Sequence, residues 1–588
     1  MRAEEALVQL VINNMKRKIE ILIKNALSNL GIEAQNVSLE HPADLNNGDY
    51  STNVAMAHAK KLGTSPRELA EKIKTEIEKE NLKEISKIEV AGAGFINFYL
   101  SHEFFVDSIK EVLKQKENWG NNNLLSGKKV MVEYTQPNPF KPFHIGHLMS
   151  NAIGESISRI VEYSGANTVR ANYQGDVGLH VAKAIYGILW LSDGAYNENI
   201  LKTDPASELA LWIGECYSKG ATAYEDSEAI KIQIDEINKK VYSRSDNEIN
   251  KIYDWGRDIT LRAFEEIYKK LGTKFNYYFF ESEMAPIGEK IVRENIGNVF
   301  TESDGAIVFH AENYDPKLHT RVFITSLGIP LYETKEVGLT VTKFEKENPD
   351  ISIITTAIEQ GEYMKVVQKA VSLIHPDYES RMKHITHGMM RLASGKMSSR
   401  KGNVVTGESL LNDSMEVVYE KVKDRELNDE EKKEISEIVG VSALKYSILK
   451  SSLGSDIIYD FEKSISFEGD SGPYLQYTAV RANSIIKKGE LEGICVSYKD
   501  VPIEITNLEK MIYQFPEIVE RSYLTLEPHH ISTYLTELAS AFNTFYGNTI
   551  IVNKNDPFAP YRISIVEAFY QTMKNGLYLL GVKTPEKM

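Results

Sequence analysis

The sequence predicts three successive parts: a small α+β domain, a doubly wound α/β domain and an all-α helical bundle. Three observations favour this order. Two strand-like runs flank a glycine turn before residue 110, a strand–loop–helix unit begins near residue 129, and helical spacing of apolar residues dominates after residue 405. The 588 residues have room for about four domains at the usual ~150 residues each.

The first part, expected over residues 1–115, opens with apolar residues at helical spacing in residues 1–30. A further helix should begin at Ser65. Ser65 can cap it, Pro66 suits its first turn, and Glu68 completes a capping box. These signals place helices in the N-terminal domain.

Strands of the same domain are expected at residues 88–90 and 95–100, joined by an Ala-Gly-Ala-Gly turn. Residues 111–127 are polar and include a Gly-Asn-Asn-Asn run, so we expect a linker there. The α+β domain should end where this linker begins.

The α/β domain is expected over residues 125–405. Residues 129–134 should form a strand, residues 136–142 a Pro-rich loop, and residues 147–160 a helix. A polar helical insertion is expected around residues 190–290. Further strands are expected near 306–310, 321–325 and 352–355.

The last part, residues 406–588, is expected to be entirely helical. Apolar residues between Ile531 and Phe545 follow i, i+3, i+4, i+7 spacing closely. Helices are also expected over 460–486 and 563–580. Such a set of helices predicts a bundle.

Composition excludes several classes of protein. With 42% hydrophobic and 26% charged residues, the chain is neither disordered nor fibrous. A net charge of −15 argues against a sequence-independent nucleic-acid coat but leaves a selective nucleic-acid partner open. Two cysteines cannot build a disulfide framework or a Cys-rich zinc site. We find neither a membrane-length apolar run nor a signal peptide, and expect a cytoplasmic protein without membrane contact.

The most informative motif is His144-Ile145-Gly146-His147, directly after the Pro-rich loop. A helix N-terminus offers unpaired N–H groups to phosphate, and two imidazoles three residues apart share a face. Gly146 lets a nucleotide approach the backbone. Two ordinary surface histidines remain the alternative.

A second signal is the run Lys396-Met397-Ser398-Ser399-Arg400-Lys401-Gly402-Asn403. A mobile cationic loop can close over a triphosphate and neutralise the charge that develops as pyrophosphate leaves. Taken alone, this run favours a solvated basic turn.

Together the two signals resemble the HIGH and KMSKS signatures of class I aminoacyl-tRNA synthetases. Other motifs make the chain similar to arginyl-tRNA synthetases over nearly its whole length. The segments that carry this resemblance are 48–55, 90–98, 133–138, 141–147, 471–477 and 574–588.

The resemblance implies a Rossmann-like catalytic domain, an N-terminal domain that binds the tRNA D-loop and a helical anticodon-binding domain. It implies that L-arginine and ATP, as its Mg²⁺ complex, form arginyl-adenylate. The arginyl group then passes to the 2′-hydroxyl of the terminal adenosine of tRNA(Arg). It further implies a monomer without zinc or a tightly bound cofactor, in which tRNA must bind before arginine is activated.

Roles at the ATP site follow from the resemblance. The residues implied in ATP binding are His144, Gly146, His147, Met389, Met397 and Ser398. The residues implied in catalysis are His144, His147, Lys141, Lys396, Arg400 and Lys401. Ser399 stands where the family loop often has Lys, so we expect Lys141 to supply the missing phosphate-binding cation. A surface lysine beside two prolines is the alternative.

Arginine recognition requires carboxylates, because a guanidinium is a planar cation with five donors. The residues that the resemblance implies in arginine binding are Glu133, Asn138, Tyr332, Glu336, Gln360 and Asp176. Glu336 replaces the Asp of the family, and residues 359–363 lack a His that many members carry. Alternatives are a core aromatic for Tyr332, a solvated charge for Glu336 and a structural turn for Asp176.

For tRNA, the resemblance implies D-loop contacts by Phe95 and Asn97. It implies anticodon contacts by Tyr474, Arg481 and Tyr546. Packing in the core is the alternative for each aromatic ring.

Three other functions are weighed. A cysteinyl-tRNA synthetase would need a zinc site that two cysteines cannot make. A non-catalytic tRNA-binding relative would be favoured by loss of a signature histidine, yet both are present. A small nucleotidylyltransferase would need far less chain and no helical tRNA domain.

Overall fold

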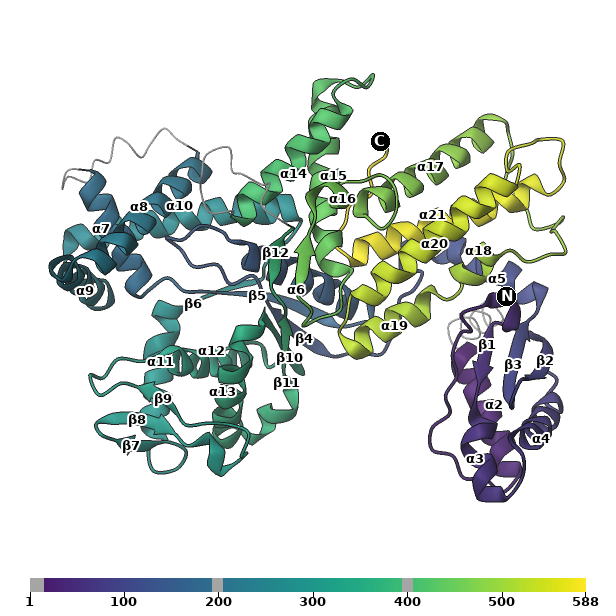
Figure 1. Cartoon of the computed structure of the whole chain (residues 1–588), viewed down its shortest axis with the longest axis horizontal. Coiled ribbons are helices and arrows are strands. Elements are labelled where there is room, and N and C mark those ends of the chain that lie inside the picture. The colour runs from purple at the N-terminus through teal and green to yellow at the C-terminus, as the bar shows by residue number, and fades with distance from the viewer. Residues whose placement is uncertain (1–14, 193–204, 394–405) are drawn as a thin grey trace.

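The computed structural model describes residues 15–192, 205–393 and 406–588. Figure 1 shows three parts: a small domain at the N-terminal end, a central sheet flanked by helices, and a long helical domain. This arrangement confirms the predicted fold class. No helix among the described residues is long and apolar enough to cross a membrane.

The N-terminal domain packs three helices on an antiparallel sheet of order β1-β3-β2. The capping box of Ser65 and Glu68 is present at the start of α4. The elements of the N-terminal domain are α2 (Met15–Asn29), β1 (Tyr50–Thr52), α3 (Val54–Leu62), α4 (Pro66–Glu78), β2 (Ile85–Ala91) and β3 (Phe95–Leu100).

The expected linker at 111–127 is in fact packed. Helix α5 (His102–Gln115) runs through its first residues, and Trp119 and Leu125 are buried. The Tyr163 hydroxyl donates to the Trp119 carbonyl at 2.7 Å. The polar composition of the segment hid these two apolar anchors.

The central sheet is entirely parallel, in the order β11-β10-β4-β5-β6. Strand β4 lies at its centre, and successive strands are added on opposite sides of it, as in doubly wound folds. Its strands are β4 (Lys129–Glu133), β5 (Asn167–Gln174), β6 (Tyr277–Phe280), β10 (Ile351–Ala357) and β11 (Met382–His387). The helices that cover it are α6 (Ile145–Tyr163), α11 (Glu281–Glu294), α12 (Tyr332–Glu347) and α13 (Gly361–Ile374).

The helical insertion ends earlier than the expected residue 290, because residues 277–280 form the edge strand β6 of the main sheet. Its helices are α7 (Leu179–Leu191), α8 (Ala206–Asp226), α9 (Glu228–Ser243) and α10 (Asn247–Leu271). The strands expected near 306 and 321 exist. They belong, however, to a separate antiparallel sheet of β7 (Thr301–Ser303), β8 (Ala306–Phe309) and β9 (Arg321–Ile324).

The C-terminal part is a helical bundle, apart from strand β13, which pairs with β12 of the preceding part. The single helix expected over 460–486 is two helices, separated by Gly469 in a left-handed conformation and restarted by the cap Ser471. Strand β12 of the preceding part is Met390–Leu392. The elements of the C-terminal part are α14 (Gly407–Val422), α15 (Asp429–Leu449), β13 (Ile457–Tyr459), α16 (Phe461–Ser464), α17 (Gly472–Leu491), α18 (Asn507–Ile512), α19 (Phe515–Thr525), α20 (His529–Asn548) and α21 (Ala559–Leu579).

Helix α6 lies between the central sheet and the C-terminal part and is buried along nearly its whole length. Its Ser156 hydroxyl donates to the Leu579 carbonyl at 2.8 Å. Nearby, the fully buried Lys445 ammonium donates to the carbonyls of Leu271 and Gly581, so that it links α15 to the ends of α10 and α21. These contacts hold the bundle against the central α/β part.

Candidate active site

A cavity of about 570 Å³ lies at the carboxyl ends of strands β4, β5 and β10. In open α/β sheets, ligands bind at this edge beside the point where the strand order reverses. The expected residues that line the cavity are Asn138, His144, Gly146, His147, Tyr332, Glu336 and Gln360. The structure thus brings the histidine motif and part of the expected arginine site into one space.

The two signature histidines lie at the start of α6, with their rings stacked at a centroid distance of 3.4 Å. His147 Nδ1 accepts the backbone N–H of His144 at 3.3 Å, so its proton resides on Nε2. Burial lowers the pKa of both imidazoles. Both are therefore neutral near pH 7 and can act as hydrogen-bond donors beside the positive end of α6.

The loop between β4 and α6 has unusual backbone geometry. Thr135, Gln136 and Phe140 have positive φ angles of 80°, 54° and 66°. The Thr135 N–H donates to Ser150 Oγ at 3.0 Å, and the Gln136 N–H donates to Asn172 Oδ1 at 3.2 Å. Non-glycine residues adopt such conformations at a cost, typically where a ligand site has to be shaped.

Asn138 lies in that loop and is anchored. Its Oδ1 accepts the Gly175 N–H at 3.2 Å. A Cβ at Gly175 would lie 2.4 Å from the same oxygen, so a larger residue there would displace the Asn138 side chain. The Asn138 amide NH₂ is left to donate to a ligand.

Lys141 is half-buried and does not line the cavity. Its ammonium lies 5.4 Å from the centre of the Tyr217 ring. Burial, and next the charge of Lys183, lower its pKa. Among the described residues no carboxylate pairs with it, so its charge remains available to an anionic ligand.

Among the buried acidic groups that line the cavity, Glu336 has the weakest protein contacts. It is buried, and its Oε2 has no hydrogen-bond partner among the described residues. Burial, and next the charge of Glu133, raise its pKa to about 8. Glu133 itself does not line the cavity, because Lys343 Nζ donates to its Oε2 at 2.5 Å and Gln136 to its Oε1 at 2.8 Å. This pairing gives Glu133 a supporting place behind the cavity.

Asp176 also lies outside the cavity lining, and the chain itself occupies its carboxylate. It accepts the Ser282 N–H at 2.9 Å, the Ser282 hydroxyl at 2.7 Å, the Tyr253 hydroxyl at 3.1 Å and the Arg257 guanidinium at 2.9 Å. This geometry fits the structural alternative: Asp176 ties β5 to α10 and to the N-terminus of α11. Contact with arginine would require breaking these bonds.

Tyr332 is 64% exposed and lines the cavity, so it is not a core aromatic. The ammonium of Lys335 lies 5.1 Å from the centre of its ring. Gln360 is also exposed, at the turn that leads into α13. Both side chains can reach a ligand from the rim.

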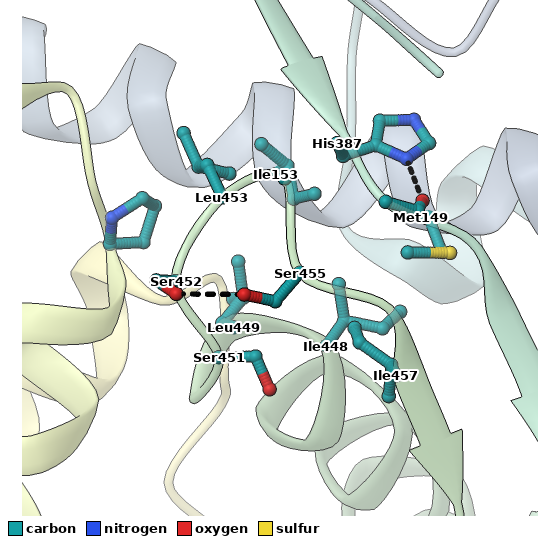
Figure 2. A pocket seen from close by; sticks show the side chains of 13 residues that line it. Met149, Ile153, His387, Ile448, Leu449, Ser451, Ser452, Leu453, Ser455 and Ile457 are labelled. Atoms are coloured by element: carbon teal, nitrogen blue, oxygen red, sulfur yellow. Dashed lines mark hydrogen bonds between the residues drawn. The ribbon is translucent and has the colours of Figure 1, made fainter. Parts of the chain in front are cut away.

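Met389 lies where the catalytic core meets the C-terminal part. Its backbone N–H donates to Asp456 Oδ1 at 2.9 Å, and its carbonyl accepts the Ile457 N–H at 2.8 Å. Figure 2 shows the neighbouring small pocket, where Met149 and Ile153 of α6 face the loop of Ser452 and Ser455. The pairing of β12 with β13 therefore attaches the segment before residue 394 to the C-terminal part.

The expected loop residues Lys396, Met397, Ser398, Arg400 and Lys401 lie outside the described residues. Strand β12 ends at Leu392, directly before that segment.

Two of the expected anticodon residues, Tyr474 and Arg481, line a second cavity of about 410 Å³, whereas Tyr546 is not among its lining residues. The Arg481 guanidinium lies 4.8 Å from the Tyr477 ring and 5.7 Å from the Tyr546 ring. Tyr546 is 46% exposed, so it is not bundle core. Cationic and aromatic groups of this kind suit unstacked bases.

The two expected D-loop residues differ in solvent exposure. Phe95 is 43% exposed on the N-terminal domain and is free to stack. Asn97 is buried, and its Oδ1 accepts the Ser51 hydroxyl at 2.7 Å. This bond fits a structural role for Asn97 between β1 and β3.

Sequence reasoning missed several charged groups at the cavity. Glu281 lines it and pairs with Lys335 at 2.7 Å, and Glu333 pairs with Arg321 at 2.8 Å. Lys343 lies seven residues after Glu336 in the helical segment, a spacing that puts both on one helix face. That spacing was a usable signal, whereas the contact of Lys343 with Glu133 spans 210 residues and had none.

Comparisons with known proteins agree with these observations. Residues 108–461 match the model of "tRNA synthetases class I (R), catalytic domain", residues 475–588 match the "DALR anticodon binding domain", and residues 17–100 match the "Arginyl tRNA synthetase N terminal domain". The chain is 30% identical to an arginine–tRNA ligase of Clostridium acetobutylicum over 573 residues, 96% of this chain and 98% of the relative. It is 32% identical to one of Fusobacterium nucleatum over 569 residues, 95% of this chain and 96% of the relative.

Solved structures show the same fold. The arginyl-tRNA synthetase of Thermus thermophilus matches with a TM-score of 0.80 at 22% identity, over 97% of this chain and 100% of that one. The enzyme of Plasmodium falciparum matches with a TM-score of 0.77 at 22% identity, over 98% and 99%. The family models and full-length relatives, with the site's geometry, establish that this chain belongs to the arginyl-tRNA synthetases of class I.

Proposed function

We propose that the cavity activates L-arginine with ATP and passes the arginyl group to the 2′-hydroxyl of the terminal adenosine of tRNA(Arg), as an arginine–tRNA ligase. The observation that supports this most directly is the buried, weakly held carboxylate of Glu336 in one cavity with two stacked histidines at a helix N-terminus. A guanidinium needs the first feature, and a polyphosphate needs the second.

ATP, which enters as its Mg²⁺ complex, is the substrate on the histidine side. The Nε2–H group of His147 and the ring N–H of His144 donate to phosphate oxygens, assisted by the dipole of α6. Lys141 approaches from behind and stabilises charge on the leaving pyrophosphate. The loop of residues 396–401 closes over the β and γ phosphates, and the segment at Met389 supports the adenine.

Arginine occupies the acidic side. Glu336 accepts the guanidinium, and the ring of Tyr332 covers it at the rim. The amides of Asn138 and Gln360 hold the α-amino and carboxylate end and aim the carboxylate at ATP. Glu133 contributes charge from behind Glu336.

The two steps need positioning and charge stabilisation, and no side chain becomes covalently attached. First, a carboxylate oxygen of arginine bonds to the α-phosphorus of ATP, and the bond from that phosphorus to pyrophosphate breaks. Then the 2′-oxygen of tRNA bonds to the arginyl carbonyl carbon. AMP leaves with the electron pair of the cleaved bond, and the hydroxyl proton is lost.

For tRNA, we assign anticodon bases to Tyr474, Arg481 and Tyr546, and the D-loop to the surface around Phe95. Asn97 supports that surface from within the sheet. The enzyme acts as a cytoplasmic monomer.

ATP–pyrophosphate exchange with each of the twenty amino acids, with and without tRNA, tests the proposal. Exchange selective for arginine and dependent on tRNA is the expected result. Exchange driven by cysteine or lysine would overturn the substrate assignment. Absence of exchange under every condition would favour a non-catalytic tRNA-binding protein.

A further inference from the structure

Three buried carboxylates at the active-site cavity each carry a cation from this chain. Every one of these pairs is neutral, so none of them contributes net charge to the pocket. The pairs are Glu133 with Lys343, Glu281 with Lys335, and Glu333 with Arg321.

Glu336 is the exception. Its side chain is buried, its Oε2 has no partner, and its Oε1 receives only a long hydrogen bond of 3.4 Å from Tyr363. No Lys or Arg within the described ranges forms an ion pair with it. A buried carboxylate without a counter-ion is costly, so it holds a proton until a cation arrives.

Lys343 connects these observations. Its ammonium and the carboxylate of Glu133 are both fully buried, with Nζ and Oε2 2.5 Å apart. Lys343 and Glu336 lie on one face of α12, and the positive charge of Lys343 opposes the effect of Glu133 on Glu336. The three groups carry two negative charges and one positive charge when all are ionised.

We propose that Lys343 is a specificity-determining positioning residue: it cancels the charge of Glu133, so that Glu133, Glu336 and Lys343 together present one negative charge to one guanidinium. This inference rests on the proposed function and adds to it the charge balance that selects a monocation. Arginine enters as the missing counter-ion, and Glu336 loses its proton as the guanidinium binds.

The pocket therefore couples arginine binding to pH. The groups that face Glu336 are Glu133 from β4, Tyr173 from β5, Glu281 from α11, Lys343 from α12 and Tyr363 from α13. Burial first, and Glu133 second, raise the pKa of Glu336 to about 8. At pH 7, binding should then release close to one proton for each arginine bound.

The test compares the KM for arginine in ATP–pyrophosphate exchange, with tRNA present, among charge variants. E133Q keeps the shape of the side chain but frees the Lys343 ammonium to pair with Glu336. The net charge becomes zero, and the KM for arginine should rise about a hundredfold, with the KM for ATP unchanged. E133Q/K343M removes both charges, and its KM for arginine should be about tenfold or more below that of E133Q. K343R keeps the cation and should stay within about fivefold of wild type.

A double variant no better than E133Q would overturn the inference, since Lys343 would then act through packing alone. The wild-type enzyme supplies a second measurement: calorimetry of arginine binding at pH 7 in Tris and in phosphate, with tRNA present. Release of about one proton supports the coupling of arginine binding to deprotonation of Glu336, and release of none overturns that coupling. If wild-type exchange is not selective for arginine, the proposed function fails before any variant is compared.

Discussion

Glu336→Gln removes the carboxylate that we assign to the guanidinium while keeping the shape of the side chain. Truncating one partner of a buried charge pair costs about 2–5 kcal/mol, and we take about 4 kcal/mol for this one. Near neutral pH the wild-type enzyme gains less than this binding free energy from the pair, because the carboxyl group must first lose a proton.

The size of that correction follows from the pKa of Glu336, which is about 8. At pH 7, one unit below this pKa, deprotonation costs about 1.4 kcal/mol. The net loss in the variant is then about 2.6 kcal/mol, close to a hundredfold in the KM for arginine. Near pH 8.5 the correction nearly vanishes, and the ratio of the two KM values should approach a thousandfold.

The assay is ATP–pyrophosphate exchange with tRNA at pH 6.5, 7.5 and 8.5, with the KM for ATP as the control. The wild-type KM for arginine should fall about tenfold per pH unit up to pH 8 and then level off, while the KM of E336Q stays flat. A ratio that stays constant with pH, or remains below about threefold, would refute the reasoning.

Three further outcomes are expected. Lys141→Ala should lower kcat about a hundredfold, a loss of about 3 kcal/mol of transition-state stabilisation, and should leave the KM for arginine unchanged. Turnover at the wild-type rate would show that Lys141 takes no part in the reaction. Gly388→Ala places a Cβ 2.3 Å from the Ser455 carbonyl and should cost about 1–3 kcal/mol in urea unfolding. Its control, Gly547→Ala, meets nothing within 4 Å and should be neutral or stabilising. Arg481→Ala should weaken tRNA binding in filter binding, while the dependence of affinity on KCl concentration stays unchanged, because a base contact releases no counterion. A salt dependence reduced by about one charge would place Arg481 on a phosphate instead of a base.

Local signals predicted much of the fold. The capping box at Ser65 begins α4, and the apolar spacing from Ile531 to Phe545 lies within α20. The missed break between α16 and α17 also had a local signal, since Ser471 followed by Pro473 marks a helix start. Helix starts and apolar helix faces can be predicted in this way because they depend on residues that lie close together in the sequence.

Contacts between distant segments could not be read in the same way. Asp176 is held by residues 77 to 106 positions away, so its occupied carboxylate was invisible in the sequence. Asn97 is likewise held by Ser51 across the sheet. The motif around each residue indicated that it matters, but only the packed structure separates contact with a ligand from support of the site.

The proposed activity depends most on where the guanidinium and the triphosphate lie. A crystal structure with arginine and a non-hydrolysable ATP analogue would measure this directly. We expect the guanidinium within hydrogen-bond distance of Glu336, and phosphate oxygens beside Nε2 of His144 and His147. A guanidinium bound away from Glu336, or phosphates that neither histidine reaches, would contradict the account.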